Sequence, residues 1–145
     1  MTIKSDYHCE FTADVPAAKA FDGICHVSGW WAKHIEGSTQ KLDSVFTVRF
    51  GETFVTFKVT DYQPNTRTVW TVADCNLHWQ EDKTEWTGTK VVWELTGKTK
   101  STDIAFTHVG LRPEVECYEA CVKGWDQHVL GSLAKLLIEG KGSPQ

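Results

Sequence analysis

The chain has 145 residues, a formal net charge of -4, 41% hydrophobic residues and 23% charged residues. At this length roughly two thirds of the unfolded surface can be buried, so we expect one hydrophobic core. The negative charge leaves no basic field to attract a phosphate backbone, so we expect no nucleic-acid partner. No segment approaches 18 apolar residues and no export leader is evident, so we expect a cytoplasmic protein without membrane insertion.

A half-buried strand and two short helices are predicted first. The strand covers residues 5–12, where apolar residues alternate with polar ones: Tyr7, Cys9 and Phe11. One helix covers residues 17–21 and ends at the next glycine, and the other covers residues 26–32. Because neighbours on a helix point about 100° apart, we expect only one of Trp30 and Trp31 to face inward.

Alternating apolar and polar residues then predict a meander of strands joined by short turns. These strands cover residues 46–50, 55–60, 66–74, 88–95 and 103–108. The inner face of 66–74 is not determined, because its apolar residues do not alternate cleanly. Residues 76–87 form either a loop or an edge strand.

A long amphipathic helix is predicted over residues 113–139. One face carries an apolar stripe: Tyr118, Cys121, Val122, Trp125, Val129, Leu133, Leu136 and Leu137. Gly140 stands where a left-handed cap is expected, and Gly124 lies inside the helix at a cost of about 1 kcal/mol. The stripe therefore requires a large apolar surface to cover.

Together these elements predict an α+β fold of the helix-grip type. A curved antiparallel sheet of six to seven strands wraps around the long C-terminal helix, and two short helices follow the first strand. We expect a single domain over residues 1–140 and a short frayed tail over residues 141–145.

Several motifs, in this order, resemble the START-like (SRPBCC, Bet v1-like) superfamily and, within it, bacterial proteins related to the activator of Hsp90 ATPase. The most specific are a strand ending in His108-Val109-Gly110-Leu111 and a helix carrying Gly124-Trp125 with Ser132-Leu133 further on. Earlier in the chain, Val15-Pro16 and Gly29-Trp30-Trp31 add to the resemblance, which covers almost the whole chain.

The resemblance implies a deep, largely apolar cavity between the sheet and the C-terminal helix. Such domains bind lipids, sterols, polyketides or plant-hormone-like ligands, some relatives are aromatase/cyclases, and the eukaryotic namesake stimulates a chaperone ATPase. On this basis we expect ligand-binding residues on the inward strand faces and on the helix: Phe57, Trp93, Phe106, His108, Tyr118 and Trp125.

His108 is the most informative polar residue. It has the inward parity of its strand, so its imidazole is predicted either to contact a ligand or, more simply, to bond the neighbouring backbone. Tyr118 and Trp125 lie seven residues apart on one helix face and suit either a cavity wall or a packed core.

The sequence gives little support for a phosphate-binding loop, a metal site or a disulfide framework. Gly97-Lys98-Thr99 lacks the first glycine of a phosphate loop and is better interpreted as a hairpin turn. Cys75 and His78 form one close pair without a second pair to complete a metal site, so we expect no metal and no cofactor. The five cysteines lack a framework spacing and are expected to be reduced thiols.

Three functions fit these features. The leading hypothesis is binding of a small hydrophobic or aromatic molecule, without catalysis. The second is a cyclase, dehydratase or hydrolase that uses the same cavity, which needs two converging polar groups. The third is an adaptor for Hsp90 or another protein, with an exposed apolar patch of Trp79, Trp86 and one of Trp30 and Trp31. The sequence leaves homodimerisation through that patch open.

Overall fold

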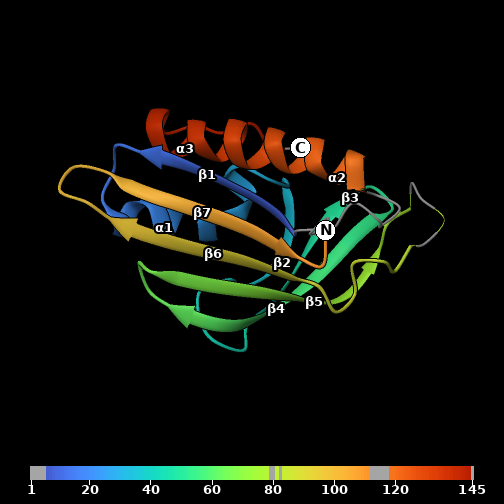
Figure 1. Ribbon diagram of the computed structural model, residues 1–145. Helices are drawn as coiled ribbons and strands as arrows, with labels where there is room; N and C mark the ends of the chain where they lie inside the picture. The colour runs from blue at the N-terminus through green and yellow to red at the C-terminus, as the bar shows by residue number, and fades with distance from the viewer. Residues whose placement is uncertain (1–5, 79–80, 82, 112–117, 145) are drawn as a thin grey trace, which may run out of the picture.

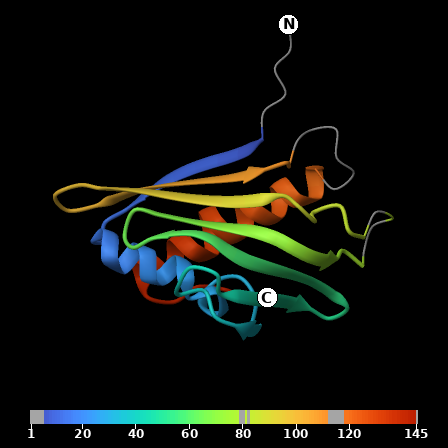
Figure 2. The ribbon, with the colours of Figure 1, turned by 90° about the horizontal axis from the view of Figure 1, so that it is seen from below.

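The computed structural model describes residues 6–78, 81, 83–111 and 118–144 (Figures 1 and 2). Seven strands in these residues form one antiparallel sheet in the order β1-β7-β6-β5-β4-β3-β2. Their bounds are β1 Tyr7–Ala13, β2 His34–Gly37, β3 Val45–Phe50, β4 Thr53–Gln63, β5 Arg67–Asn76, β6 Lys90–Gly97 and β7 Thr102–Val109. The predicted meander is confirmed, and β2 is an additional edge strand that the sequence pattern does not predict.

One face of the sheet forms the core, because side chains with period two point the same way along each strand. On β6 and β7 the predicted parity is confirmed, and the inward residues are Val91, Trp93, Leu95, Ile104, Phe106 and His108. On β5 the inward residues include Thr68, Trp70 and Val72, and the first two lie opposite Trp93 and Val91 of β6. Two register shifts between β4 and β5 bend this part of the sheet.

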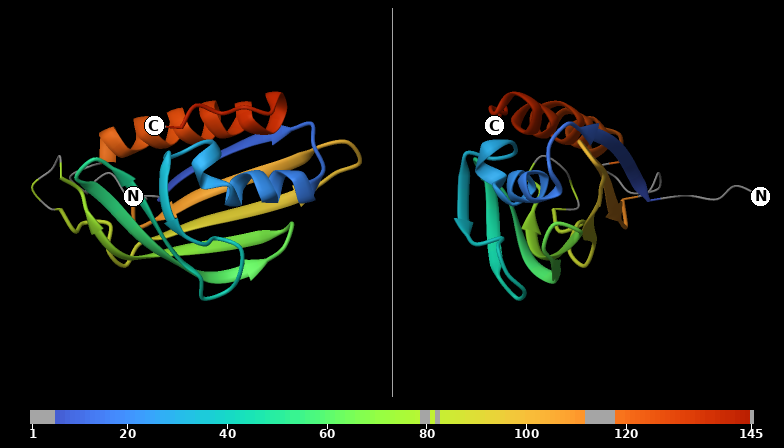
Figure 3. Two further views of the ribbon diagram at one scale, coloured as in Figure 1. Left: turned by 180° about the vertical axis from the view of Figure 1, so that it is seen from behind. Right: turned by 90° about the vertical axis from the view of Figure 1, so that its left-hand side faces the viewer.

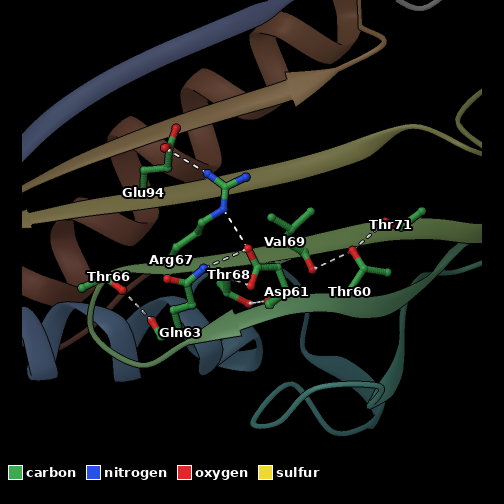
Figure 4. Close-up of polar contacts among 9 residues, drawn as sticks. All are labelled: Thr60, Asp61, Gln63, Thr66, Arg67, Thr68, Val69, Thr71 and Glu94. Carbon is green, nitrogen blue, oxygen red and sulfur yellow. Dashed lines mark hydrogen bonds and ion pairs between the residues drawn. The ribbon is translucent and has the colours of Figure 1, made fainter.

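The outer face is polar, and Arg67 links three of its strands. Its guanidinium donates hydrogen bonds to Asp61 of β4 and Glu94 of β6, at 2.9 and 3.0 Å (Figure 4). Hydrogen bonds from Gln63 and then from Arg67 lower the pKa of the Asp61 carboxyl. The alternation of apolar inner and polar outer residues explains why one face of the sheet is wet.

Helix α1 (Ala17–Cys25) is longer than predicted, because Gly23 does not end it. The glycine instead allows close packing, since a Cβ there would lie 2.4 Å from Leu137 Cδ2 of the C-terminal helix. A short 3₁₀ helix, η1 (Val27–Gly29), follows in place of the predicted second helix.

Both Trp30 and Trp31 are buried, with exposed fractions of 0% and 4%, so the prediction that only one faces inward is wrong. The physical reason is that the 3₁₀ turn ends at Gly29, and Trp30 has φ of -140° rather than a helical value. Outside helical geometry the two rings stack, with centroids 5.8 Å apart.

The described part of the C-terminal helix begins at Tyr118, and the predicted first turn over 113–117 lies outside the described residues. It consists of α2 (Tyr118–Trp125), a π-helical segment η2 (Asp126–Leu133) and α3 (Ala134–Glu139). Trp125 and Leu133 are buried, Tyr118 is half-buried, and Gly140 caps the helix with φ of 83°. Figure 3 shows this helix lying across the open side of the curved sheet, as predicted.

The chain after the helix turns back on it. Ser132 Oγ donates a hydrogen bond to the carbonyl of Trp30 at 2.6 Å and accepts one from the amide of Ser143 at 2.7 Å. A Cβ at Gly142 would lie 2.4 Å from the carbonyl oxygen of Gly29. Residues 141–144 are therefore held against η1 rather than frayed.

Two further predictions need correction. Trp86 is 8% exposed, so together with Trp30 and Trp31 it does not form the predicted surface patch, and Trp79 lies outside the described residues. Cys121 is disulfide-bonded, whereas Cys9, Cys25 and Cys75 carry the predicted free thiols. Within the described residues, no helix is long and apolar enough to span a membrane.

Candidate functional site

A cavity of about 320 Å³ lies where α2 passes over β3, β4 and the segment after β5. Strand and loop residues form one side: Trp31, Phe50, Thr53, Val55, Leu77 and Trp86. Helix residues form the other side: Ala120, Cys121, Gly124, Trp125 and His128. The volume lies at the small end of the range for ligand pockets, which are mostly apolar with a few polar groups.

Three tryptophans form an aromatic wall around this cavity. The ring of Trp125 lies 4.9 Å from that of Trp31, and it stacks on that of Trp86 at 5.7 Å and 15°. Such pairs are stabilised beyond their buried area by the offset of their ring quadrupoles. The wall is therefore rigid and offers flat apolar faces.

A hydrogen-bonded chain behind the wall holds Trp125 and Trp86 in place. The indole N–H of Trp125 donates to His108 Nδ1 at 3.0 Å, which makes this nitrogen the acceptor. His108 Nε2 therefore carries the proton and donates to Thr89 Oγ1 at 2.9 Å. The Thr89 hydroxyl in turn donates to the carbonyl of Trp86 at 2.6 Å.

His108 is fully buried, with an exposed fraction of 0%. Burial lowers its pKa to about 3, because the charged imidazolium would lose its hydration, while Asp6 acts weakly in the opposite direction. Both of its nitrogens are bonded within the protein. His108 therefore positions the cavity wall as a neutral residue and does not line the cavity.

Gly124 keeps the cavity open on the helix side. A Cβ built at this residue meets no atom within 4 Å, in contrast to Gly23, where one would collide with the side chain of Leu137. The missing side chain thus contributes empty space directly beside Trp125.

His128 is a cavity residue that the sequence analysis missed. Its half-buried ring lies 6.4 Å from the rings of both Trp31 and Phe50, and desolvation lowers its pKa. A signal was available in the sequence, because His128 follows Trp125 by three residues and so shares its helix face. Hydrophobicity alone does not reveal it, because a histidine does not count toward an apolar stripe.

The structure separates the six predicted ligand-binding residues. Trp125 lines the cavity, and His108 supports it from behind. Phe57, Trp93 and Phe106 are fully buried in a continuous aromatic core, and Tyr118 lies half-buried on α2 outside the cavity lining. Whether these residues contact a ligand stays a prediction.

The two residues considered as a metal pair each have other partners. The Cys75 thiol lies against the carbonyl of Lys83 and the hydroxyl of Thr87, and His78 Nε2 lies 2.7 Å from a carboxylate oxygen of Glu52. Among the described residues, no three His, Cys, Asp or Glu side chains are grouped to hold a metal ion.

The fold is the helix-grip (START/Bet v1-like) fold predicted from the sequence, and solved structures with the same fold include an Aha1 dimer. The Aha1 dimer from Colwellia psychrerythraea is 22% identical, with a TM-score of 0.77 over 97% of this chain and 100% of that chain. A protein from Mesorhizobium loti is 19% identical, with a TM-score of 0.69 over 90% of this chain and 96% of that one.

A third similar structure is larger. DynU16, described as a putative protein in the dynemicin biosynthetic locus, is 18% identical over 93% of this chain, with a TM-score of 0.67. The chain spans about half of that protein, because the match covers 48% of it. No family model and no curated protein matches the chain. At these identities the likeness establishes the fold alone.

Proposed function

We propose that the protein binds a small hydrophobic or aromatic molecule in the cavity under α2. The observation that carries this proposal is the aromatic wall of Trp31, Trp86 and Trp125 around about 320 Å³ that Gly124 leaves unfilled. Preformed apolar pockets with few polar groups bind such molecules well, because their walls need no reorganisation.

Binding is favoured over catalysis by the chemistry of the lining. General acid–base catalysis needs two polar groups that converge on one ligand position. Of the described lining residues, His128 is the one with an imidazole or carboxylate side chain. His108 is fully engaged behind the wall by Trp125 and Thr89.

The test fills the cavity from the helix. Gly124→Trp places an indole in the open space, and Gly131→Trp is the matched control, because Gly131 is exposed and also has no atom within 4 Å of an added Cβ. Native mass spectrometry and tryptophan fluorescence against a library of aromatic and lipid compounds measure binding. We expect the first variant to lose uptake and the control to retain it. Equal uptake by both variants, or no uptake by the wild type, would contradict the proposal.

A second copy of this chain is a further partner that the comparisons support, since the similar Colwellia protein is described as a dimer. Leu130 and Ile138 are exposed on the outer face of the C-terminal helix, with fractions of 41% and 60%. Sedimentation of the wild type and of Leu130→Lys measures whether this face associates. The chaperone-adaptor hypothesis stays untested, and it has lost the tryptophan patch on which it was based.

A further inference from the structure

We propose that His128 selects the ligand by donating one hydrogen bond from Nε2 to a neutral oxygen, so that the cavity takes an aromatic molecule bearing a carbonyl group. This inference rests on the proposed function and adds the polar feature that the ligand must carry. Three features support it: the position of the His128 ring, the different surroundings of the two ring nitrogens, and the apolar character of the cavity wall.

The ring of His128 is held in the cavity wall by aromatic neighbours. It stacks at 26° on Phe50 and lies tilted against Trp31, with both centroid distances at 6.4 Å. The residue belongs to the π-helical segment η2, and such segments are frequent at functional sites. The imidazole is thus positioned by packing before any ligand arrives.

The two ring nitrogens differ in a way that fixes the tautomer. Nδ1 is buried and has no hydrogen-bond partner among the described residues. A buried N–H without an acceptor is rarer in proteins than a buried lone pair without a donor, so the proton belongs on Nε2. Nε2 also forms no hydrogen bond to a described residue, but unlike Nδ1 it is not fully buried. It is therefore a free donor on the accessible side of the ring.

Two neighbouring residues of the wall already form hydrogen bonds within the protein. Trp125 Nε1 donates to His108, and Thr53 Oγ1 accepts the amide proton of His78 at 3.2 Å. A ligand acceptor that enters the cavity beside Phe50 can accept a hydrogen bond from the unpaired imidazole N–H of His128. Pairing this donor recovers the hydrogen bond that the ring loses when a ligand displaces water from it.

The charge state of His128 decides which acceptor fits. Desolvation favours the neutral ring, so it offers a dipole and no positive charge near neutral pH. A carboxylate ligand would bring an uncompensated charge against Trp31, Phe50 and Val55, which is costly in an apolar environment. The oxygen of a ketone or quinone needs only one neutral donor. The planar body of an aromatic ketone or quinone also matches the flat faces of the tryptophans.

The experiment compares two probes of equal size, 2-acetylnaphthalene and 2-isopropylnaphthalene, by titration calorimetry. We expect the wild type to bind the ketone about 5- to 10-fold more tightly than the hydrocarbon, the value of one net hydrogen bond. His128→Phe keeps a flat ring without a donor and should lose this preference while still binding the hydrocarbon. His128→Gln restores an N–H donor and should recover part of it.

The outcomes separate this inference from the proposed function. If the wild type binds neither probe, the proposed function fails. If it binds both with equal affinity, or if His128→Phe keeps the preference, only the role of His128 is overturned. Long-range proton–nitrogen NMR of the wild type gives a readout that needs no variant. We expect protonation on Nε2 and a shift of that nitrogen when the ketone binds, and a proton on Nδ1 would overturn the inference.

Discussion

The buried imidazole of His108 makes a quantitative prediction about acid stability. Its pKa is about 3 in the folded protein, against an ordinary value of about 6.5 in the unfolded chain. The unfolded chain therefore binds a proton more readily once the pH falls below about 6.5, and stability is lost as the pH decreases. Linkage gives a loss of about 2 kcal/mol between pH 7 and pH 5 from this residue, and almost none above pH 7.

The substitution His108→Gln removes this titration while keeping polar partners for both neighbours. A glutamine carbonyl can accept the indole N–H of Trp125, and its amide can donate to Thr89. We expect the variant to lose about 2 kcal/mol less than the wild type over the same pH interval, whatever its stability at pH 7. The other histidines are present in both proteins, so the difference between the two curves isolates His108.

Urea unfolding at pH 7, 6 and 5, followed by tryptophan fluorescence, measures both curves. Parallel curves for the two proteins would refute the reasoning, because they would mean that His108 titrates alike in the folded and unfolded chains. A wild type that gains stability toward pH 5 relative to the variant would show that the sign is wrong.

Three other substitutions test the packing, each by the free energy of urea unfolding. Gly124→Ala should stabilise the protein by about 1 kcal/mol, because it removes helix-interior glycine without a clash, and a loss would contradict the open space assigned there. Gly37→Ala should destabilise it by more than about 1 kcal/mol, because φ is 91° and the added Cβ would lie 2.1 Å from the carbonyl oxygen of Val45. Tyr7→Phe removes the hydroxyl that donates to Asp126 of the C-terminal helix and should cost about 1 kcal/mol; no change would show that this contact adds nothing.

The strands could be predicted from the sequence where apolar and polar residues alternate along the whole strand. Alternation in β6 and β7 placed Trp93, Phe106 and His108 on the inner face, and the structure agrees. It failed in β5, where Val69 is buried as well as Trp70, and where two register shifts against β4 break the period. Bulges depend on the partner strand, so a single strand's sequence does not reveal them.

The site was less predictable, because a cavity is what packing leaves empty. Phe57, Trp93 and Phe106 were expected to line a deep pocket, but large aromatic side chains fill that region. The open volume lies instead beside a helix residue without a side chain, Gly124. Hydrophobicity identified Trp125 and excluded His128, although both lie on the same helix face.

The two hydrogen bonds of Ser132, to Trp30 and from Ser143, tie the end of the chain to the cavity wall. Truncation after Glu139 would leave the Ser132 hydroxyl without its amide donor and uncover the turn that carries Trp30 and Trp31. Because Trp31 lines the cavity, trimming the last residues should loosen a wall that lies far from them in sequence. Binding data from chains shortened at this end should therefore be compared with data from chains that keep residues 140–144.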